Sequence, residues 1–171
     1  AQPSFAQIAK KEITVSAAIS LKNAFEEIGR TLKGYHPEAR FLFNFGASGD
    51  LARQIEAGAP VDVFASAAQK DMEGIDRKGL ILPGTRTNFA GNGVVLVQPS
   101  LSRIRIESFE DLKKTEVKRI VMGNPKTVPA GRYAEEVLKS FNLWDGIIDK
   151  LVLAENVRQA LDYVARNEVD A

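Results

Sequence analysis

One arrangement recurs along the chain and constrains its fold more than any other feature. A short β-branched or aromatic run is followed by a turn of small residues and then by a helical pattern of apolar residues. In the first half, strands are expected at 12–17, 40–45 and 61–65, and helices at 21–33, 49–57 and 69–78. Strands that alternate with helices in this way predict an α/β fold, with parallel-rich sheets covered by helices on both faces.

The pattern is interrupted once and then resumes. Residues 82–92 (LPGTRTNFAGN) are rich in turn formers, and the apolar run 93–98 (GVVLVQ) that follows them is expected to form a strand. Beyond it we expect a short helix at 108–114 capped by Ser108, strands at 118–122 and 151–154, and helices at 131–141 and 157–166. The sequence thus indicates an N-terminal tail at 1–11, a first α/β lobe at 12–90 and a second α/β lobe at 91–171, with a hinge strand near 93–98.

Composition excludes several kinds of chemistry. The chain has 171 residues, a formal net charge of +1, one His and no Cys. It therefore offers no thiolate nucleophile, disulfide framework or cysteine-ligated zinc, and a single His cannot build a multi-histidine metal site. The near-zero charge gives no global attraction to nucleic acid. No apolar run is long enough for a membrane helix, and residues 1–11 do not read as an intact signal peptide. Both a cytoplasmic protein and a mature exported protein stay open.

Residues at four strand-to-helix turns share one chemical property. Ser20, Ser48, Ala130 and Val157 each lie at a predicted helix start, where backbone N–H groups lack internal acceptors and the helix dipole is positive. Such turns gather at the carboxyl edge of parallel strands, where ligands bind in open α/β sheets. Grouped there, they would favour a small anion. Taken singly, each Ser is better explained as an ordinary N-cap, and Asn156 before Val157 is an ordinary cap as well.

Signals for an enzyme are missing. The GASG stretch at 46–49 lacks the Lys of a phosphate-binding loop, and there is no dinucleotide fingerprint and no nucleophile elbow. His36 lies in a predicted turn with no Ser or carboxylate placed to form a triad with it. Arg132 and Arg158 follow two of the proposed anion-binding turns. Solvation on a helix surface is the default expectation for both.

Several strings make the chain recognisable. They are ITV (13–15), AAISL (17–21), FGASGDLARQI (45–55), EAGAPVDVFASA (56–67), GNP (123–125), VPAGRYA (128–134) and AENVRQAL (154–161). Together they resemble the periplasmic molybdate-binding proteins of ABC transporters, a family whose molybdate and tungstate binders look alike. The resemblance runs in unbroken order from about residue 12 to residue 171.

This resemblance implies a fold, a ligand and a location. The family has the two-lobe periplasmic-binding-protein fold (type II), with the ligand in the cleft between the lobes. Carried over by motif, its oxyanion ligands fall on Ser20 and Ser48, through hydroxyl and backbone N–H, and on the backbone N–H groups of Ala130 and Val157. Molybdenum would thus be held only through its oxyanion, with no side chain on the metal. The resemblance further implies no catalysis, no cofactor, a periplasmic mature form with its signal peptide removed, delivery of molybdate or tungstate to a membrane permease, no nucleic-acid partner, and a monomer when full length.

Two alternatives to this interpretation stay open. One is an anion-sensing effector domain of a regulator, which uses the same architecture. The other is a receptor for a different tetrahedral oxyanion, such as sulfate. One departure from the family pattern is also expected to matter. The family continues past Ala171 into a strand that carries a Tyr contacting the oxyanion and then returns to the first lobe, so the second lobe is expected to be incomplete in this chain.

Overall fold

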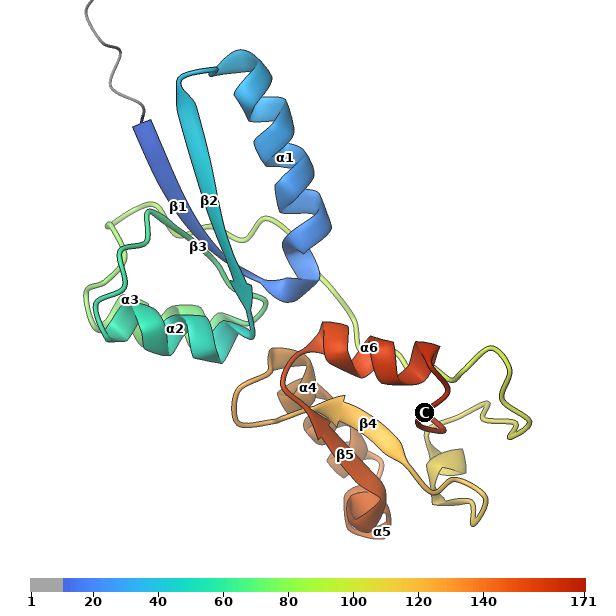
Figure 1. Cartoon of the computed structure of the whole chain (residues 1–171). Helices are drawn as coiled ribbons and strands as arrows, with labels where there is room; N and C mark the ends of the chain where they lie inside the picture. Colours follow the sequence, from blue (N-terminus) through green and yellow to red (C-terminus); the bar gives the residue numbers. More distant parts are fainter. Residues whose placement is uncertain (1–10) are drawn as a thin grey trace, which may run out of the picture.

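The computed structural model describes residues 11–171, which form two α/β lobes (Figure 1). The first lobe contains β1 (Lys11–Ala18), the 3-10 helix η1 (Ile19–Leu21), α1 (Lys22–Tyr35), β2 (Ala39–Gly46), α2 (Ser48–Glu56), β3 (Val63–Ala65) and α3 (Gln69–Arg77). The second contains η2 (Glu110–Lys113), β4 (Ile120–Gly123), α4 (Pro129–Ser140), α5 (Trp144–Ile147), η3 (Ile148–Lys150), β5 (Leu151–Ala154) and α6 (Val157–Ala165).

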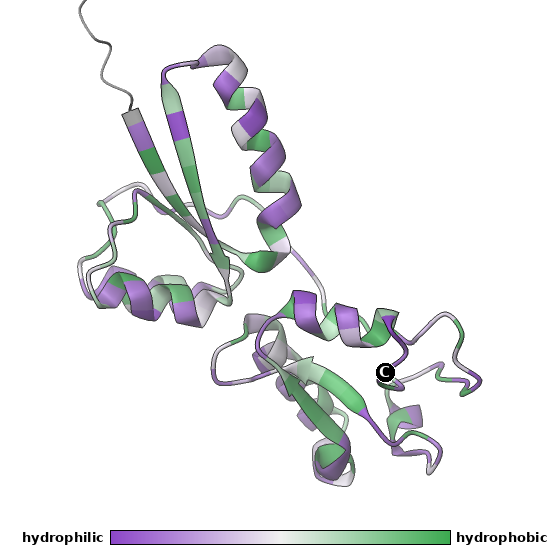
Figure 2. Ribbon diagram, viewed as in Figure 1, coloured by the Kyte–Doolittle hydropathy of each residue, from purple (hydrophilic) through white to green (hydrophobic). Residues whose placement is uncertain are grey.

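The first lobe is a three-stranded parallel sheet in the order β2-β1-β3, with helices on both faces. Alternate residues of β1 face opposite sides. Val15 and Ala17 pack with Phe25 of α1, whereas the hydroxyl of buried Ser16 lies 3.4 Å from the amide nitrogen of Asn44, which also bonds Gln54 of α2. Apolar residues accordingly concentrate in the strands, and the helices carry both polar and apolar residues (Figure 2).

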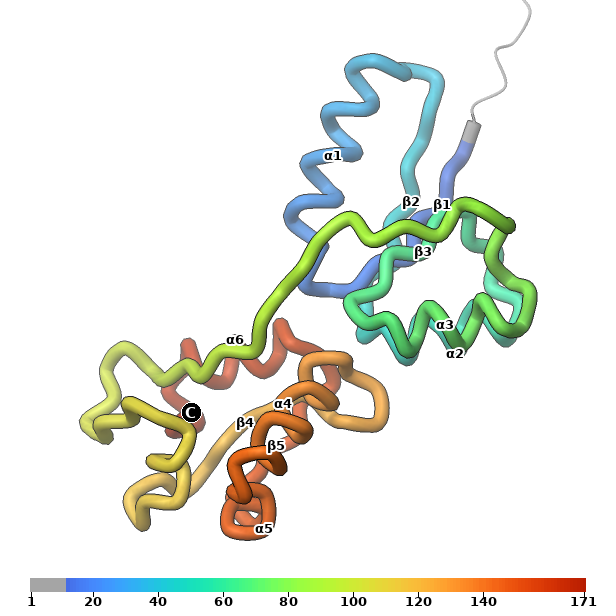
Figure 3. The backbone as a smooth tube through the Cα atoms, turned by 180° about the vertical axis from the view of Figure 1, so that it is seen from behind, coloured from blue at the N-terminus to red at the C-terminus, as the bar shows by residue number. Residues whose placement is uncertain are grey.

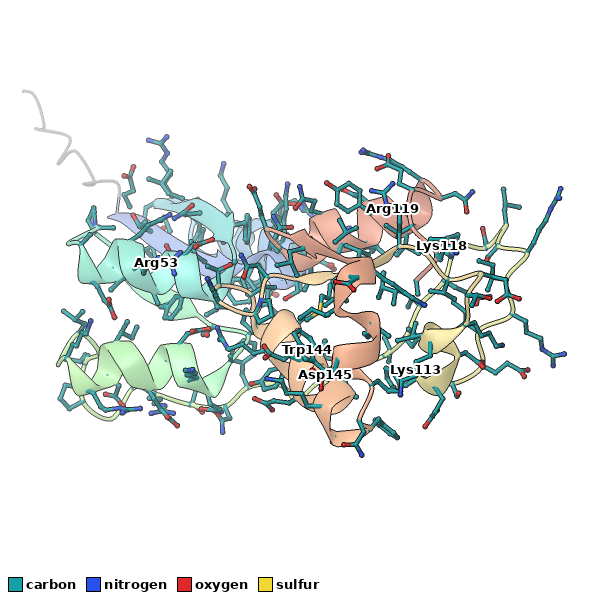
Figure 4. The ribbon with its side chains drawn as sticks, turned by 90° about the horizontal axis from the view of Figure 1, so that it is seen from below. Arg53, Lys113, Lys118, Arg119, Trp144 and Asp145 are labelled. Atoms are coloured by element: carbon teal, nitrogen blue, oxygen red, sulfur yellow. The ribbon has the colours of Figure 1, made fainter. Side chains whose placement is uncertain are left out.

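The second lobe is built around β4 and β5, which pair in parallel from Ile120↔Leu151 to Gly123↔Ala154. Helices α4 and α6 both contact β4 and lie on opposite sides of the strand pair (Figure 4). The core joins residues of β4 and α4 to residues of η2, α5 and the flanking loops: Leu112, Val117, Ile120, Met122, Leu138, Leu143, Ile147 and Ala171. The last residues run beside β4, where Val121 N–H donates to the Ala171 carbonyl at 2.8 Å.

The segment between the lobes differs from the prediction. No strand forms at 93–98, and among the described residues its backbone has no ladder partner; its recorded backbone bond is a local one, from Gly93 N–H to the Asn92 side chain at 2.9 Å. The hinge-strand prediction was wrong because an apolar run becomes a strand only where a neighbouring strand supplies hydrogen bonds. The tail predicted at 1–11 lies outside the described residues, except that Lys11 already begins β1.

The turn-rich residues before this segment are held to the first lobe. Arg86 donates to Asp76 and Gln69 of α3, and the Phe89 ring packs edge-on against Phe25 at 6.3 Å. Within the described chain the backbone then passes to the second lobe in a single crossing (Figure 3). These contacts support the division into 12–90 and 91–171, which stays a prediction.

A second local prediction also fails. Ser108 does not cap a helix, because η2 begins after Phe109 and has no side-chain cap. The carboxylate of Asp111 instead accepts from the backbone N–H groups of Glu107, at 2.8 Å, and Ser108, at 3.3 Å. The Glu107 N–H bond first, and then a hydrogen bond from Lys114, hold the pKa of Asp111 below its ordinary value.

No helix within residues 11–171 combines the length and the apolar character that crossing a membrane requires. Nor do His, Asp and Glu gather there in a group of three or more that could hold a metal ion.

Candidate functional site

The carboxyl ends of the strands in the two lobes lie at facing edges. In the first lobe Ala18 at the end of β1 pairs with Gly46 at the end of β2, and in the second Gly123 pairs with Ala154. Each lobe contacts the other at these ends. Helix α6 lies against η1, and Gly49 N–H in the first turn of α2 donates to the Thr127 carbonyl just before α4, at 3.2 Å. The turns that carry the four predicted site residues therefore lie at the boundary between the lobes.

Neither predicted serine is an N-cap. Ala47 occupies the N-cap position of α2, and Ser48 is its first residue, fully buried, with a hydroxyl oxygen that accepts from Ala67 N–H at 2.9 Å. Ser20 lies inside η1, which has Ala18 at its N-cap and no side-chain cap. The ordinary capping role that would have explained both residues is thus not the one they have. A hydroxyl that accepts a bond still has its proton to donate, so Ser48 remains a donor.

The second-lobe residues offer backbone groups. Ala130 is the second residue of α4, directly after Pro129, and Val157 is the first residue of α6. Asn156 caps α6 as predicted, and its side-chain oxygen accepts from Gln159 N–H at 3.0 Å. The cap therefore accepts from the third N–H of the helix. The first N–H, on Val157, does not bond to the cap.

The four predicted positions share an unoccupied donor. Across residues 11–171, no acceptor is recorded for the backbone N–H of Ser20, Ser48, Ala130 or Val157. Three of these groups lie in the first turns of α2, α4 and α6, where aligned peptide dipoles place partial positive charge. Chemically, the arrangement can offer hydrogen bonds to a small anion without any cationic side chain.

The two arginines near these turns behave differently from each other. Arg158 is exposed, as predicted. Arg132 is not solvated: its side chain is 14% exposed and forms an ion pair with Asp71 of α3, in the first lobe, at 2.5 Å. The surface prediction for Arg132 was wrong because its partner comes from a distant helix. Sequence patterns gave no signal for this pair, nor for the contact between Gly49 and Thr127.

A cavity of about 400 Å³ lies beside the facing edges. It is lined by Asp50, Asn124, Thr127, Leu153, Ala154 and Glu155, and none of the four predicted site residues is among them. The carboxylates of Asp50 and Glu155 make this cavity unfavourable for an anion. The candidate oxyanion site is the group of helix starts, and this cavity lies beside it.

Comparison with known proteins identifies the family. The family described as bacterial extracellular solute-binding protein matches residues 13–171. The molybdate-binding protein ModA of Haemophilus influenzae is 38% identical over 167 residues, covering 96% of this chain and 66% of that protein. The chain spans 62–66% of the length of curated relatives of this kind.

Solved structures show the same fold. The periplasmic molybdate-binding protein of Azotobacter vinelandii matches with a TM-score of 0.77 and 25% identity, over 92% of this chain and 68% of that one. The sulfate-binding protein SubI of Mycobacterium tuberculosis matches with a TM-score of 0.72 over 94% of this chain and 63% of that one, and at 15% identity it bears on the fold alone. The two-lobe periplasmic-binding-protein fold is thereby confirmed, and the chain belongs to the bacterial extracellular solute-binding proteins.

Proposed function

We propose that this protein binds molybdate between its lobes and delivers it to the membrane permease of an ABC importer, without catalysing a reaction. The observation that carries the proposal is the set of unoccupied N–H donors on Ser20, Ser48, Ala130 and Val157, at helix starts that both lobes bring to one boundary. The identity to molybdate-binding relatives supports the choice of ligand. Tungstate, a tetrahedral dianion of similar size, is expected to bind in the same way. The proposed location is the periplasm or the outer surface of the cell.

Hydrogen bonds alone are strong enough for this task. A hydrogen bond to a charged partner contributes about 1.5–3 kcal/mol, and micromolar binding requires about 8 kcal/mol. Towards the upper end of that range, four to six such bonds exceed this amount and also offset the cost of ordering the two lobes. Because sulfate is also a tetrahedral dianion, selectivity would come from the spacing of the donors, which fits the larger ion and leaves gaps around the smaller one.

Val157 allows a test of the backbone donor. Val157→Ala keeps the N–H and should bind molybdate almost normally, whereas Val157→Pro removes it and should weaken binding by about 1.5–3 kcal/mol, or roughly ten- to 150-fold. The fold should tolerate proline, because the first helical position suits it and Asn156 before it is extended, at φ −162° and ψ 169°. Titration calorimetry measures both variants. Equal losses in the two would contradict the proposed role of the N–H.

The serines test the hydroxyl donors. Ser20→Ala and Ser48→Ala should each weaken molybdate binding by about 1–3 kcal/mol. Ser140→Ala is a matched control, since Ser140 is exposed at the end of α4 and bonds only its own helix, at Val137. Fluorescence or calorimetric titration gives the three affinities. Unchanged affinity in Ser20→Ala and Ser48→Ala would remove both side chains from the site.

A panel of anions decides the ligand. Molybdate and tungstate should raise the melting temperature, because a ligand that binds only the folded state stabilises it. Stabilisation by sulfate or phosphate but not by molybdate would replace the proposal with the alternative oxyanion receptor.

A further inference from the structure

Among residues 11–171, polar contact between the lobes is confined to two places. One is the backbone bond from Gly49 to Thr127, and the other is the ion pair between Arg132 and Asp71. All other recorded ion pairs join groups within one lobe, on side chains that are mostly exposed. Exposed pairs contribute little, because solvent screens them.

The pair between Arg132 and Asp71 differs from these surface pairs in burial. Its side chains are 14% and 10% exposed, so solvent screens their attraction much less than at the surface. Separating the lobes would expose both charged side chains to water and break the ion pair. Keeping the lobes together but removing one charge would leave the other largely buried and unpaired, which is unfavourable. The interaction is therefore available only when the lobes are together.

Arg132 also lies near the start of α4, close to the proposed donor Ala130. It is two residues after Ala130, in the first turn of α4, and its partner Asp71 lies in the first turn of α3. The ion pair thus fixes the end of α4 that presents the Ala130 N–H against the opposite lobe. Few other described contacts hold that end in register with the first-lobe donors Ser20 and Ser48.

We propose that Arg132 and Asp71 are positioning residues that form a latch between the lobes and slow the release of the bound oxyanion. This inference rests on the proposed function for its ligand, but the latch itself is a property of the protein alone. Neither side chain is assigned a contact with the anion. Their effect is on how long the lobes stay together, and hence on the dissociation rate more than on the association rate.

The kinetic test uses molybdate and stopped-flow fluorescence. Asp71→Asn and Arg132→Gln should each accelerate molybdate release about tenfold or more and change the association rate less than threefold. The double variant should release molybdate no faster than the faster single variant, because the interaction can be lost only once and no buried charge is left unpaired. Asp76→Asn is the matched control, since Asp76 lies on the same helix and pairs with Arg86 inside the first lobe at 3.1 Å. It should release molybdate at the normal rate.

A second test needs no ligand. The chain has no Cys, so Lys33→Cys on α1 and Lys118→Cys before β4 give unique label sites, one in each lobe. Distances between spin labels should shift to longer values in Asp71→Asn and Arg132→Gln and stay unchanged in Asp76→Asn. Unchanged distances in the two latch variants, or the same shift in the control, would overturn the latch. Failure of molybdate to bind, with the distance shift present, would overturn the proposed function and leave the latch standing.

Discussion

Replacing Gly49 by alanine is expected to weaken molybdate binding about five- to 150-fold without lowering the melting temperature. A Cβ at this position would lie 2.7 Å from the carbonyl oxygen of Thr127 and 3.3 Å from its Cα, both in the backbone of the other lobe. Forcing an atom into such a space costs about 1–3 kcal/mol, which corresponds to that loss of affinity. Separation of the lobes relieves the clash, so the penalty falls on the closed protein and not on the fold of either lobe.

Gly74 provides the control for this substitution. It lies inside α3, where an added Cβ meets nothing within 4 Å. Gly74→Ala should therefore show only the benefit of helix propensity, up to about 1 kcal/mol, with unchanged affinity. Calorimetric titration and thermal melts of both variants measure the two quantities. Normal binding by Gly49→Ala would mean that the lobes do not need the contact at Thr127 in order to hold the anion.

Gly131→Ala is expected to have the opposite effect to Gly49→Ala: it should lower the melting temperature strongly, because its clash lies within one lobe. Its Cβ would lie 2.0 Å from the carbonyl oxygen of Gly123 and 3.0 Å from the carbonyl carbon of Asn124. Here the first turn of α4 approaches the end of β4 directly, and opening of the cleft offers no relief. Overpacking against backbone should cost about 3 kcal/mol or more, which lowers the melting temperature of a chain this size by roughly 6–12 °C.

Circular dichroism melts test this prediction. The near-UV signal of Trp144, in the helix that follows α4, reports on the second lobe in particular. A melting temperature within 2 °C of the unsubstituted protein, roughly 1 kcal/mol or less on the same scale, would contradict the close approach of α4 to β4. The two glycines thus separate a clash between lobes, which affects binding, from a clash inside a lobe, which affects folding.

The regular elements could be predicted because local pattern and tertiary structure agree in them. β5 has the predicted bounds Leu151–Ala154, and α6 begins at Val157 behind the predicted cap Asn156. The strand predicted at 93–98 does not form, because strand formation depends on a partner strand that the local sequence does not reveal.

The placement of the strand-to-helix turns at one edge was predictable for a topological reason. Parallel strands bring their carboxyl ends to one edge, so the turns that contain Ser20 and Ser48 could be grouped before their positions were known. The contacts between the lobes could not be predicted in this way. Asp71 and Arg132 are 61 positions apart on two helices that look amphipathic and ordinary, and only the placement of one lobe on the other pairs them. Sequence periodicity predicts elements within a lobe but not the contacts where the two lobes meet.

The burial of the ion pair between Arg132 and Asp71 has a consequence for how the proposed receptor can be tuned. Under the proposed latch, this pair determines how long the two lobes stay together around the ion. The groups proposed to bind the ion are separate from this pair, since they are two serine hydroxyls and the main-chain N–H groups at the helix starts. Retention time and ion preference can therefore vary independently, so variants at positions 71 and 132 could adapt the protein to scarce or abundant supplies while it selects the same ion.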